Sequence, residues 1–349
     1  MTRVAAPLMS TLAMVLLLGA CTSAEGPGAS PTEPDRRSTP SPGGGDSAGA
    51  PGSVAPRSEL PQTDTPLTPL SPAPSGPAEE RASFDAAAAM ADVRLLAGEI
   101  GPRLATGPAY RRAGRVVERR FEELGYRVRQ EAFDVPAGDS WGVPVEAGQS
   151  FNVVAEPAGF DPFEPHVVLG AHLDTVAVAP GAEDNASGVA VLLGLARLAV
   201  AQETRMPVVF IAFGAEEPRG SGDDLHHFGS QHHVRQLGGP RRDALAAMVS
   251  LDRVGVGRVV PVCTGPLSPP RVQRELLRAA ARVDVPAQAC ENTASDHWSF
   301  EKAGFAVARL GSTSYAEYHS RGDLPRVVDR AQLTRTGRLA WAWLSGPDA

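Results

Sequence analysis

Histidines and carboxylates recur in this sequence where apolar stretches end, and their chemical types suit metal binding. Five of them form an inventory of two histidines and three carboxylates, namely His172, Asp184, Glu217, Asp252 and His319. Imidazole nitrogens and carboxylate oxygens are zinc ligands, and a pair of zinc ions can share one bridging carboxylate. The inventory therefore predicts two Zn²⁺ ions per chain.

Two further carboxylates stand beside these residues and suggest a hydrolase. Glu216 precedes Glu217 in "FGAEEP", and adjacent residues of an extended chain point in opposite directions. Glu217 can then bind metal while Glu216 faces a substrate water and acts as a base. Asp174 lies two residues after His172 in "GAHLDT", on the same face, where it can orient the histidine ring. The chemistry expected is that of a di-zinc hydrolase.

Each of these positions also has an ordinary structural interpretation. Asp174 and Asp184 could cap helices, Asp252 could be a loop acid, and His319 could be a surface histidine. The adjacent Glu216 and Glu217 are more specific, because burying two carboxylates at a strand end is costly without a cation. Taken together and in this order, the positions favour the metal site.

The apolar pattern predicts the elements that position these residues. Strands are expected at 126–133, 151–155, 166–169, 206–213, 246–251 and 306–310, and the run 206–213 should be buried on both faces. Helices are expected at 84–98, 110–124, 188–201, 271–283 and 328–344, with Ser187 as an N-cap. This alternation predicts an α/β fold with a mostly parallel central sheet and helices on both faces. Ligands bind such sheets at the carboxyl ends of the strands, where the candidate residues fall.

The first residues have the pattern of a bacterial lipoprotein signal. Arg3 precedes a short apolar run at 12–18, and "LLGAC" then places Cys21 after small residues. The run is too short to span a bilayer, so residues 1–20 should be removed and Cys21 lipidated. The protein is then expected to be exported and anchored to the extracytoplasmic face of the cell membrane. An ordinary secretory signal with a chance cysteine is the alternative.

The rest of the chain divides by composition. Residues 21–83 are rich in Pro, Ser and Gly and should form a disordered stalk, because they cannot bury enough apolar surface to fold. Residues 84–349 have the composition of one catalytic domain. The net charge is −7, so the chain lacks the excess of basic residues typical of nucleic-acid-binding proteins, and nucleic acid is not an expected partner. The oligomeric state is left open, with a monomer expected.

Two groups of residues keep alternative readings. Cys263 and Cys290 could pair in an oxidising compartment, or remain two buried thiols. Histidines 226, 227, 232 and 233 follow Glu217 and could suggest another metal site. They are expected instead to lie in a solvated loop at the rim of the cleft, where the loop shapes substrate access.

From about residue 84 to the C-terminus, the chain resembles the bacterial co-catalytic zinc aminopeptidases of metallopeptidase family 28. Besides the residues above, "GPRLATGPAYRRAGRVVERRFEELGYRV" resembles that family's opening helices, and "SDHWSF" resembles a segment beside its metal site. The segment "PRGSGDDLHH" after Glu217 departs from the family, being longer and more polar than its usual link.

The resemblance implies a role for each candidate residue. It implies one zinc on His172, Asp184 and Asp252, and the other on Asp184, Glu217 and His319. Glu216 falls at the position of the general base. Tyr318 matches a position that in some members stabilises the oxyanion, with simple packing as the alternative.

The function expected is therefore that of a zinc aminopeptidase acting on peptide substrates. A glutaminyl cyclase shares much of this pattern but uses a single zinc, so the complete ligand set argues modestly against it. Another di-zinc exopeptidase or amidohydrolase carrying "HxDT" is disfavoured by the "DNASG" context. A binding module on an inactive peptidase fold is also conceivable, but every ligand and the base are present.

Overall fold

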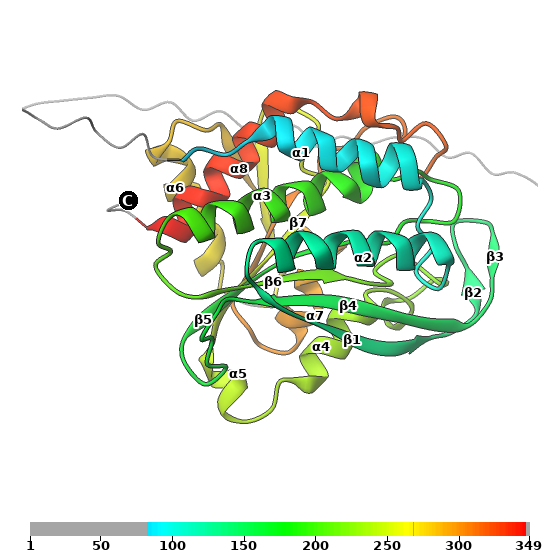
Figure 1. The fold of residues 1–349 in the computed structure, drawn as a ribbon, viewed down its shortest axis with the longest axis horizontal. Helices are drawn as coiled ribbons and strands as arrows, with labels where there is room; N and C mark the ends of the chain where they lie inside the picture. Colours follow the sequence, from blue (N-terminus) through cyan, green and yellow to red (C-terminus); the bar gives the residue numbers. More distant parts are fainter. Residues whose placement is uncertain (1–81, 268, 347–349) are drawn as a thin grey trace, which may run out of the picture. The chain divides into compact units, whose positions relative to one another are not determined.

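An eight-stranded sheet forms the centre of the protein (Figure 1). The computed structural model describes residues 82–267 and 269–346; the expected signal, Cys21 and the stalk up to residue 81 lie outside them. In spatial order the strands are β1 (Arg127–Val135), β4 (Gly148–Glu156), β6 (Val208–Phe213), β5 (His166–His172), β7 (Leu245–Asp252), β10 (Val307–Gly311), β8 (Val260–Thr264) and β9 (Ala287–Glu291).

The middle of the sheet is parallel. Strands β6, β5, β7 and β10 run in the same direction. Strands β8 and β9 are parallel to each other but run opposite to these four. The pairs β1–β4, β4–β6 and β10–β8 are antiparallel. The expected mostly parallel α/β sheet is confirmed, and the parallel strands share one carboxyl edge. A small separate hairpin, β2 (Gly138–Asp139) and β3 (Pro144–Val145), lies outside this sheet.

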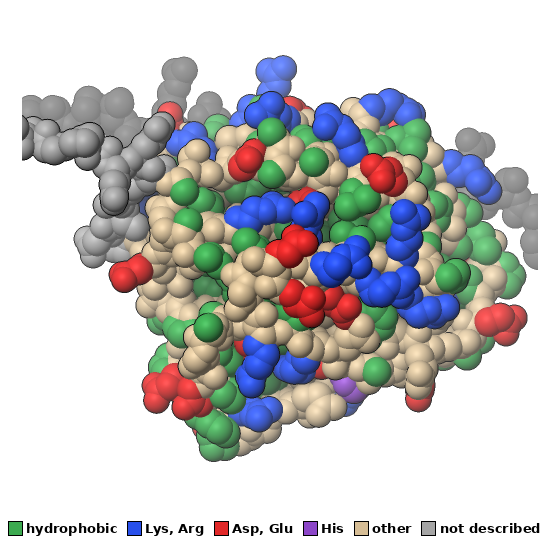
Figure 2. Space-filling model, in the orientation of Figure 1, with side chains coloured by type: hydrophobic (Ala, Val, Ile, Leu, Met, Phe, Trp, Pro, Cys, Tyr) green, Lys and Arg blue, Asp and Glu red, His purple; other side chains and the backbone are tan. Residues whose placement is uncertain are grey.

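Helices cover both faces of the sheet, as Figure 1 shows. On one side lie α1 (Ala86–Val93), α2 (Pro108–Glu123), α3 (Ser187–Ala201), α6 (Arg271–Arg282) and α8 (Arg330–Ser345). On the other lie α4 (Phe228–Gln236), α5 (Pro240–Ala244) and α7 (His297–Lys302). Short helical turns are η1 (Arg94–Ile100), η2 (Ala182–Ala186), η3 (Asp223–Leu225) and η4 (Pro325–Val327). Charged side chains of both signs are scattered over the visible face, among polar and apolar ones (Figure 2).

Successive side chains of a strand point to opposite faces of the sheet, so the apolar strand β6 contributes to a core on each face. Val208, Phe210 and Ala212 of β6 pack in the larger core, whereas Val209, Ile211 and Phe213 pack in the smaller one on the opposite face. A strand buried on both faces must be apolar at every position, so the prediction for this run is confirmed. Each such side chain stabilises the fold by about 1.5–3 kcal/mol relative to an exposed one.

The helical stretch Ala182–Ala201 is apolar for the same reason. Its length and composition would suffice to cross a membrane, but 78% of its most apolar window is buried inside the structure. It is the core helix of the domain. Its expected cap is wrong: the Ser187 hydroxyl donates to the Glu183 carbonyl at 2.7 Å and accepts the Val254 N–H at 3.2 Å. Ser187 already has helical backbone angles, and the Gly188 N–H donates to Asn185 Oδ1 at 2.9 Å, so Ser187 is not the cap of this helix.

The predicted helices and strands are all present, most with ends that differ by a few residues. Sequence patterning missed β2, β3, β8, β9, α4, α5 and α7, which are short or lack a clean apolar period. Of the two alternatives for Cys263 and Cys290, the structure shows the disulfide, which joins the neighbouring strands β8 and β9.

Candidate metal centre

The candidate residues meet at the carboxyl edge of the parallel strands. His172 ends β5, Glu216 and Glu217 follow β6, and Asp252 ends β7. Asp184 lies in η2, immediately before α3, and His319 lies in the loop after β10. Strands that run in parallel end at the same edge of a sheet, so residues distant in sequence become neighbours there.

The donor atoms form two groups that share Asp184. His172 Nε2 lies 3.0 Å from Asp184 Oδ1 and 3.8 Å from Asp252 Oδ1. His319 Nε2 lies 3.2 Å from both Asp184 Oδ2 and Glu217 Oε2. Within each group the donor atoms lie within 4.8 Å of one another. One oxygen of Asp184 thus faces each group, which is the arrangement of a bridging carboxylate.

The chemistry of these donors fits a pair of metal ions. The five side chains are buried, and among the residues described Glu217 Oε1 and Asp252 Oδ1 have no hydrogen-bond partner. Buried acceptors without partners are costly, and a cation would satisfy them. Nitrogen and carboxylate donors in these numbers match zinc.

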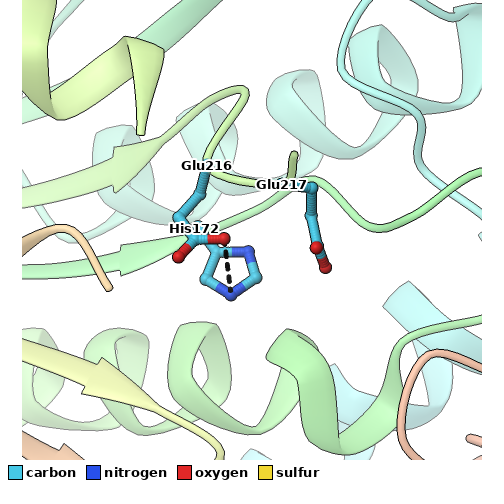
Figure 3. Close-up of side chains that lie close together, drawn as sticks. All are labelled: His172, Glu216 and Glu217. Carbon is cyan, nitrogen blue, oxygen red and sulfur yellow. Dashed lines mark ion pairs between the residues drawn. The ribbon is translucent and has the colours of Figure 1, made fainter. Parts of the chain in front are cut away.

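Glu216 belongs to neither of these two groups, but it lies beside one member of each. Its Oε2 lies 4.0 Å from His172 Nε2, and Figure 3 shows Glu216 against the His172 ring with Glu217 to its side. His172, Glu216 and Glu217 form a third set of donors close enough for a metal ion. Glu216 therefore borders the centre and can reach a molecule bound there.

Asp174 acts differently from the expectation. His172 Nδ1 lies 3.2 Å from the backbone carbonyl of Asp174, and the carboxylate is farther away at 3.8 Å. The carboxylate instead accepts the backbone N–H groups of Glu216 at 3.0 Å and of Glu217 at 3.2 Å. It positions the two glutamates, while its main chain orients the histidine.

Burial and close charges shift the pKa values of these groups. Burial raises the pKa of Glu217 to about 8, although His319 acts in the opposite direction. Burial also acts to raise the pKa of Asp184, but hydrogen bonds from His172 and His319 outweigh it and hold that pKa below its usual range. Burial opposes a charged His319, yet Glu217 and Asp184 raise its pKa to about 10. A cation binding here would displace these protons.

Two arginines beside Asp252 were missed by sequence reasoning. Arg309 Nη2 lies 3.1 Å from Asp252 Oδ2 in a fully buried position, and Arg253 Nε lies 3.8 Å from Asp252 Oδ1. Burial acts to raise the pKa of Asp252, but Arg309, His172 and Arg253 together outweigh it and the pKa falls. The signal that could have been noticed is an arginine inside the otherwise apolar strand "FAVARLG".

Aromatic rings surround His319 at the mouth of the site. Tyr318 stacks on the His319 ring with centroids 3.7 Å apart, and Trp141 meets the same ring edge-on at 4.3 Å. Trp141 is 55% exposed and Tyr318 38% exposed, so both belong to the rim. They line a cavity of about 80 Å³ with Arg253 and the donor residues other than His172. Trp141, on the β2–β3 hairpin, was not anticipated.

The expected solvated histidine loop is only partly correct. Residues 221–224 are exposed, but His227 and His233 are buried. His233 Nδ1 pairs with Glu131 Oε2 at 2.9 Å, and His227 Nε2 lies 3.2 Å from Glu216 Oε1. Helix α4 brings these side chains inward. Among the described residues, none of the four histidines belongs to a group of metal donors.

Such a fold, with paired zinc-type donors at the carboxyl edge of its sheet, defines the class of α/β metallopeptidases. The family model of peptidase family M28 matches residues 152–344, more than half of the 349-residue chain. The chain belongs to peptidase family M28.

Individual relatives agree with this assignment. The aminopeptidase YwaD of Bacillus subtilis (strain 168) is 29% identical over 187 residues, which cover 50% of this chain and 40% of that protein. The chain spans less than half the length of the curated relatives it matches.

Solved structures share the fold. A zinc aminopeptidase from Bacillus subtilis, BSAP, has a TM-score of 0.66 at 18% identity, over 74% of this chain and 94% of its own. A glutaminyl cyclase from Bacteroides thetaiotaomicron, bound to N-acetylhistamine, has a TM-score of 0.65 at 20% identity, over 77% and 100% of the two chains.

Proposed function

We propose that this protein is a di-zinc aminopeptidase that removes N-terminal residues from peptides. The observation that carries the proposal is the pair of donor groups that share Asp184, with Glu216 at their border. Membership of peptidase family M28 and the similarity to an aminopeptidase support it.

Each proposed zinc position uses donors from different parts of the chain. His172, Asp184 and Asp252 would hold one ion, and Asp184, Glu217 and His319 the other. Bound zinc would supply Lewis acidity, which acidifies a water molecule and polarises the scissile carbonyl. Arg309 supports this set by pairing with Asp252 Oδ2, which leaves Oδ1 for the ion.

Glu216 has the position of a general base. One of its oxygens faces the donor cluster, and its backbone is held by Asp174. The carboxylate accepts the proton of the attacking water and later passes it to the nitrogen of the leaving amine. The Tyr318 hydroxyl, on the wall of the same cavity, is proposed to donate a hydrogen bond to the developing oxyanion.

The shape and charge of the site favour a free N-terminus. The carboxylates attract an α-ammonium group, and the cavity of about 80 Å³ leaves little room for residues that precede the first one. Short unblocked peptides and aminoacyl amides are therefore the proposed substrates, with a weak preference for an apolar first residue. Acetylated peptides should be rejected.

The experiment combines one substitution with metal analysis and mass spectrometry. Glu216→Gln should keep two zinc ions per chain and lose activity by about a hundredfold or more, because an amide cannot accept the water's proton. Glu203→Gln, at an exposed glutamate before β6 and so at the opposite end of that strand from Glu216, is the matched control. Digests of unblocked peptides should form ladders that shorten from the N-terminus.

Other results would assign another function. Near-wild-type turnover of Glu216→Gln at full zinc occupancy would refute the base. One zinc per chain with loss of ammonia from an N-terminal glutamine would indicate a glutaminyl cyclase. Internal fragments or C-terminal trimming would indicate an endopeptidase or a carboxypeptidase.

We further propose that the protein is a lipoprotein anchored through Cys21 on the extracytoplasmic face of the membrane. The support is the sequence "LLGAC" ahead of a Pro- and Ser-rich stretch. Cys21→Ala should release the protein from the membrane fraction or leave an unprocessed precursor. Wild-type protein free in the medium, with a mature N-terminus other than residue 21, would contradict the anchor.

A further inference from the structure

His227 makes a close contact with the proposed general base. The side chain is buried, 4% exposed, and its Nε2 lies 3.2 Å from Glu216 Oε1. His227 ends the polar segment between Glu217 and α4. The contact is thus made by a residue only eleven positions after Glu216 in the chain.

Backbone hydrogen bonds place His227 opposite Glu216. The N–H groups of residues 227, 228 and 229 donate to the carbonyls of residues 216, 215 and 214, at 2.9, 2.8 and 3.0 Å respectively. Residues 217–226 therefore form a closed loop whose two ends are paired. A Cβ at Gly229 would lie 2.3 Å from both the Gly214 carbonyl oxygen and Asn152 Oδ1, so this pairing requires glycine. The position of His227 follows from the main chain and not from its side chain alone.

The two oxygens of Glu216 have different neighbours. Oε1 faces His227, whereas Oε2 lies 4.0 Å from His172 Nε2, on the side of the metal donors. A ring N–H that donates to Oε1 restricts rotation of the carboxylate and leaves Oε2 directed at the donor cluster. Preorganisation of this kind is what keeps a base within reach of its proton.

A purely structural role for His227 does not account for its contacts. Its other ring nitrogen, Nδ1, is buried and has no hydrogen-bond partner among residues 82–267 and 269–346. The polar contact of the ring is therefore the one with Glu216. The neighbouring buried histidine on α4, His233, is satisfied by Glu131 and lies away from the centre.

From these contacts we infer that His227 is a positioning residue, which holds Glu216 through Oε1 so that Oε2 serves as the base. The inference rests on the proposed function, because it assigns Glu216 the role of the base. It gives the loop of residues 217–226 a role in catalysis, since the paired ends of that loop place the His227 ring against the Glu216 carboxylate.

The test uses two substitutions of His227 in the purified, zinc-loaded protein. His227→Phe keeps a planar ring without the donor, and should lower kcat by about ten- to a hundredfold with KM little changed. His227→Gln restores an N–H near the position of Nε2 and should recover most of kcat. His232→Gln, on the helix that follows His227 and with its ring against Phe133, is the matched control and should behave as the wild type. Zinc content and melting temperature, measured for each variant, identify loss of folding or metal.

A second readout needs no substrate. In protein labelled with ¹⁵N-histidine, the ring N–H signal that disappears in His227→Phe should exchange slowly with water and should shift in Glu216→Gln. If that signal is absent or insensitive to Glu216→Gln, the inference is wrong, as it is if His227→Phe retains the wild-type kcat. The protein could fail to shorten unblocked peptides and still show a His227 ring N–H signal that shifts in Glu216→Gln. That result would refute the aminopeptidase function but support the contact between His227 and Glu216.

Discussion

Replacing Asp174 by asparagine tests how the two adjacent glutamates are held. Both oxygens of this buried carboxylate accept backbone N–H groups, Oδ1 from Glu216 at 3.0 Å and Oδ2 from Glu217 at 3.2 Å. An asparagine has one acceptor oxygen, and its NH₂ group would face the second N–H. One charge-assisted hydrogen bond is lost, and one buried donor loses its acceptor.

The expected cost follows from these two changes. A hydrogen bond to a charged group contributes about 1.5–3 kcal/mol, and an unsatisfied buried donor costs about 1–3 kcal/mol. Burial raises the pKa of Asp174, and repulsion from Glu216 acts in the same direction, so removing the charge offsets part of this loss. We expect a net destabilisation of about 2–4 kcal/mol, or a melting temperature lower by roughly 4–16 °C. Turnover should fall about ten- to a hundredfold because Glu216 and Glu217 shift together.

The assay is thermal unfolding followed by steady-state kinetics on the same zinc-loaded samples at pH 7. Asp161→Asn is a matched control, because Asp161 is exposed and accepts a single N–H, that of Phe163, which an asparagine can retain. An Asp174→Asn variant with unchanged kcat and an unchanged or higher melting temperature would refute the positioning role. It would mean that relief of charge repulsion outweighs the lost hydrogen bonds.

Three further substitutions test other contacts. Burial acts to raise the pKa of Glu131, but the hydrogen bond and charge of His233 together with Arg129 outweigh it, so the pKa falls well below its usual range. A group whose pKa is lowered by folding stabilises the protein above its unfolded pKa, and that stability is lost as the pH falls. Glu131→Gln should therefore lower the melting temperature at pH 7, with a difference from wild type that narrows below about pH 4.3, whereas exposed Glu122→Gln should have no effect. Replacing Cys263 and Cys290 together by alanine opens a bridge between residues 27 positions apart and should cost roughly 3.5 kcal/mol in denaturant unfolding. Tyr318→Phe should lower kcat about a hundredfold if the hydroxyl stabilises the oxyanion, and an unchanged kcat would assign the ring to packing on His319.

Local patterns in the sequence predict the chemistry of the centre well. The apolar run before Glu216 has the length and composition of a strand buried on both faces, and two carboxylates directly after it require a cation or another partner. The helix after Asp184 is apolar at nearly every position because it lies in the core. Strands and helices that alternate in this way form a sheet whose carboxyl edge gathers the residues that follow each strand.

Pairs of side chains, in contrast, depend on contacts between segments that are distant in sequence. One oxygen of Asp184 faces His172 and the other faces His319, because the loop after β10 brings His319 close to the end of β5. The histidines after Glu217 looked like a solvated loop because the sequence pattern does not show that residues 227–229 pair with residues 214–216. That pairing turns a polar segment inward, since backbone hydrogen bonds and not hydrophobicity decide its path.

Arg309 in β10 also shows what the sequence predicts and what only the tertiary structure decides. A charge within "FAVARLG" is visible in the sequence, and burial of that charge implies an acidic partner. Only the register identifies the partner: Arg309 lies opposite Ser250 in the parallel pair β7–β10, so Asp252, two residues farther, is on the same face. The sequence by itself determined the residue types of the centre and the layered α/β fold. The tertiary structure decided which atoms face one another, because strand order and register act over distances that no local pattern spans.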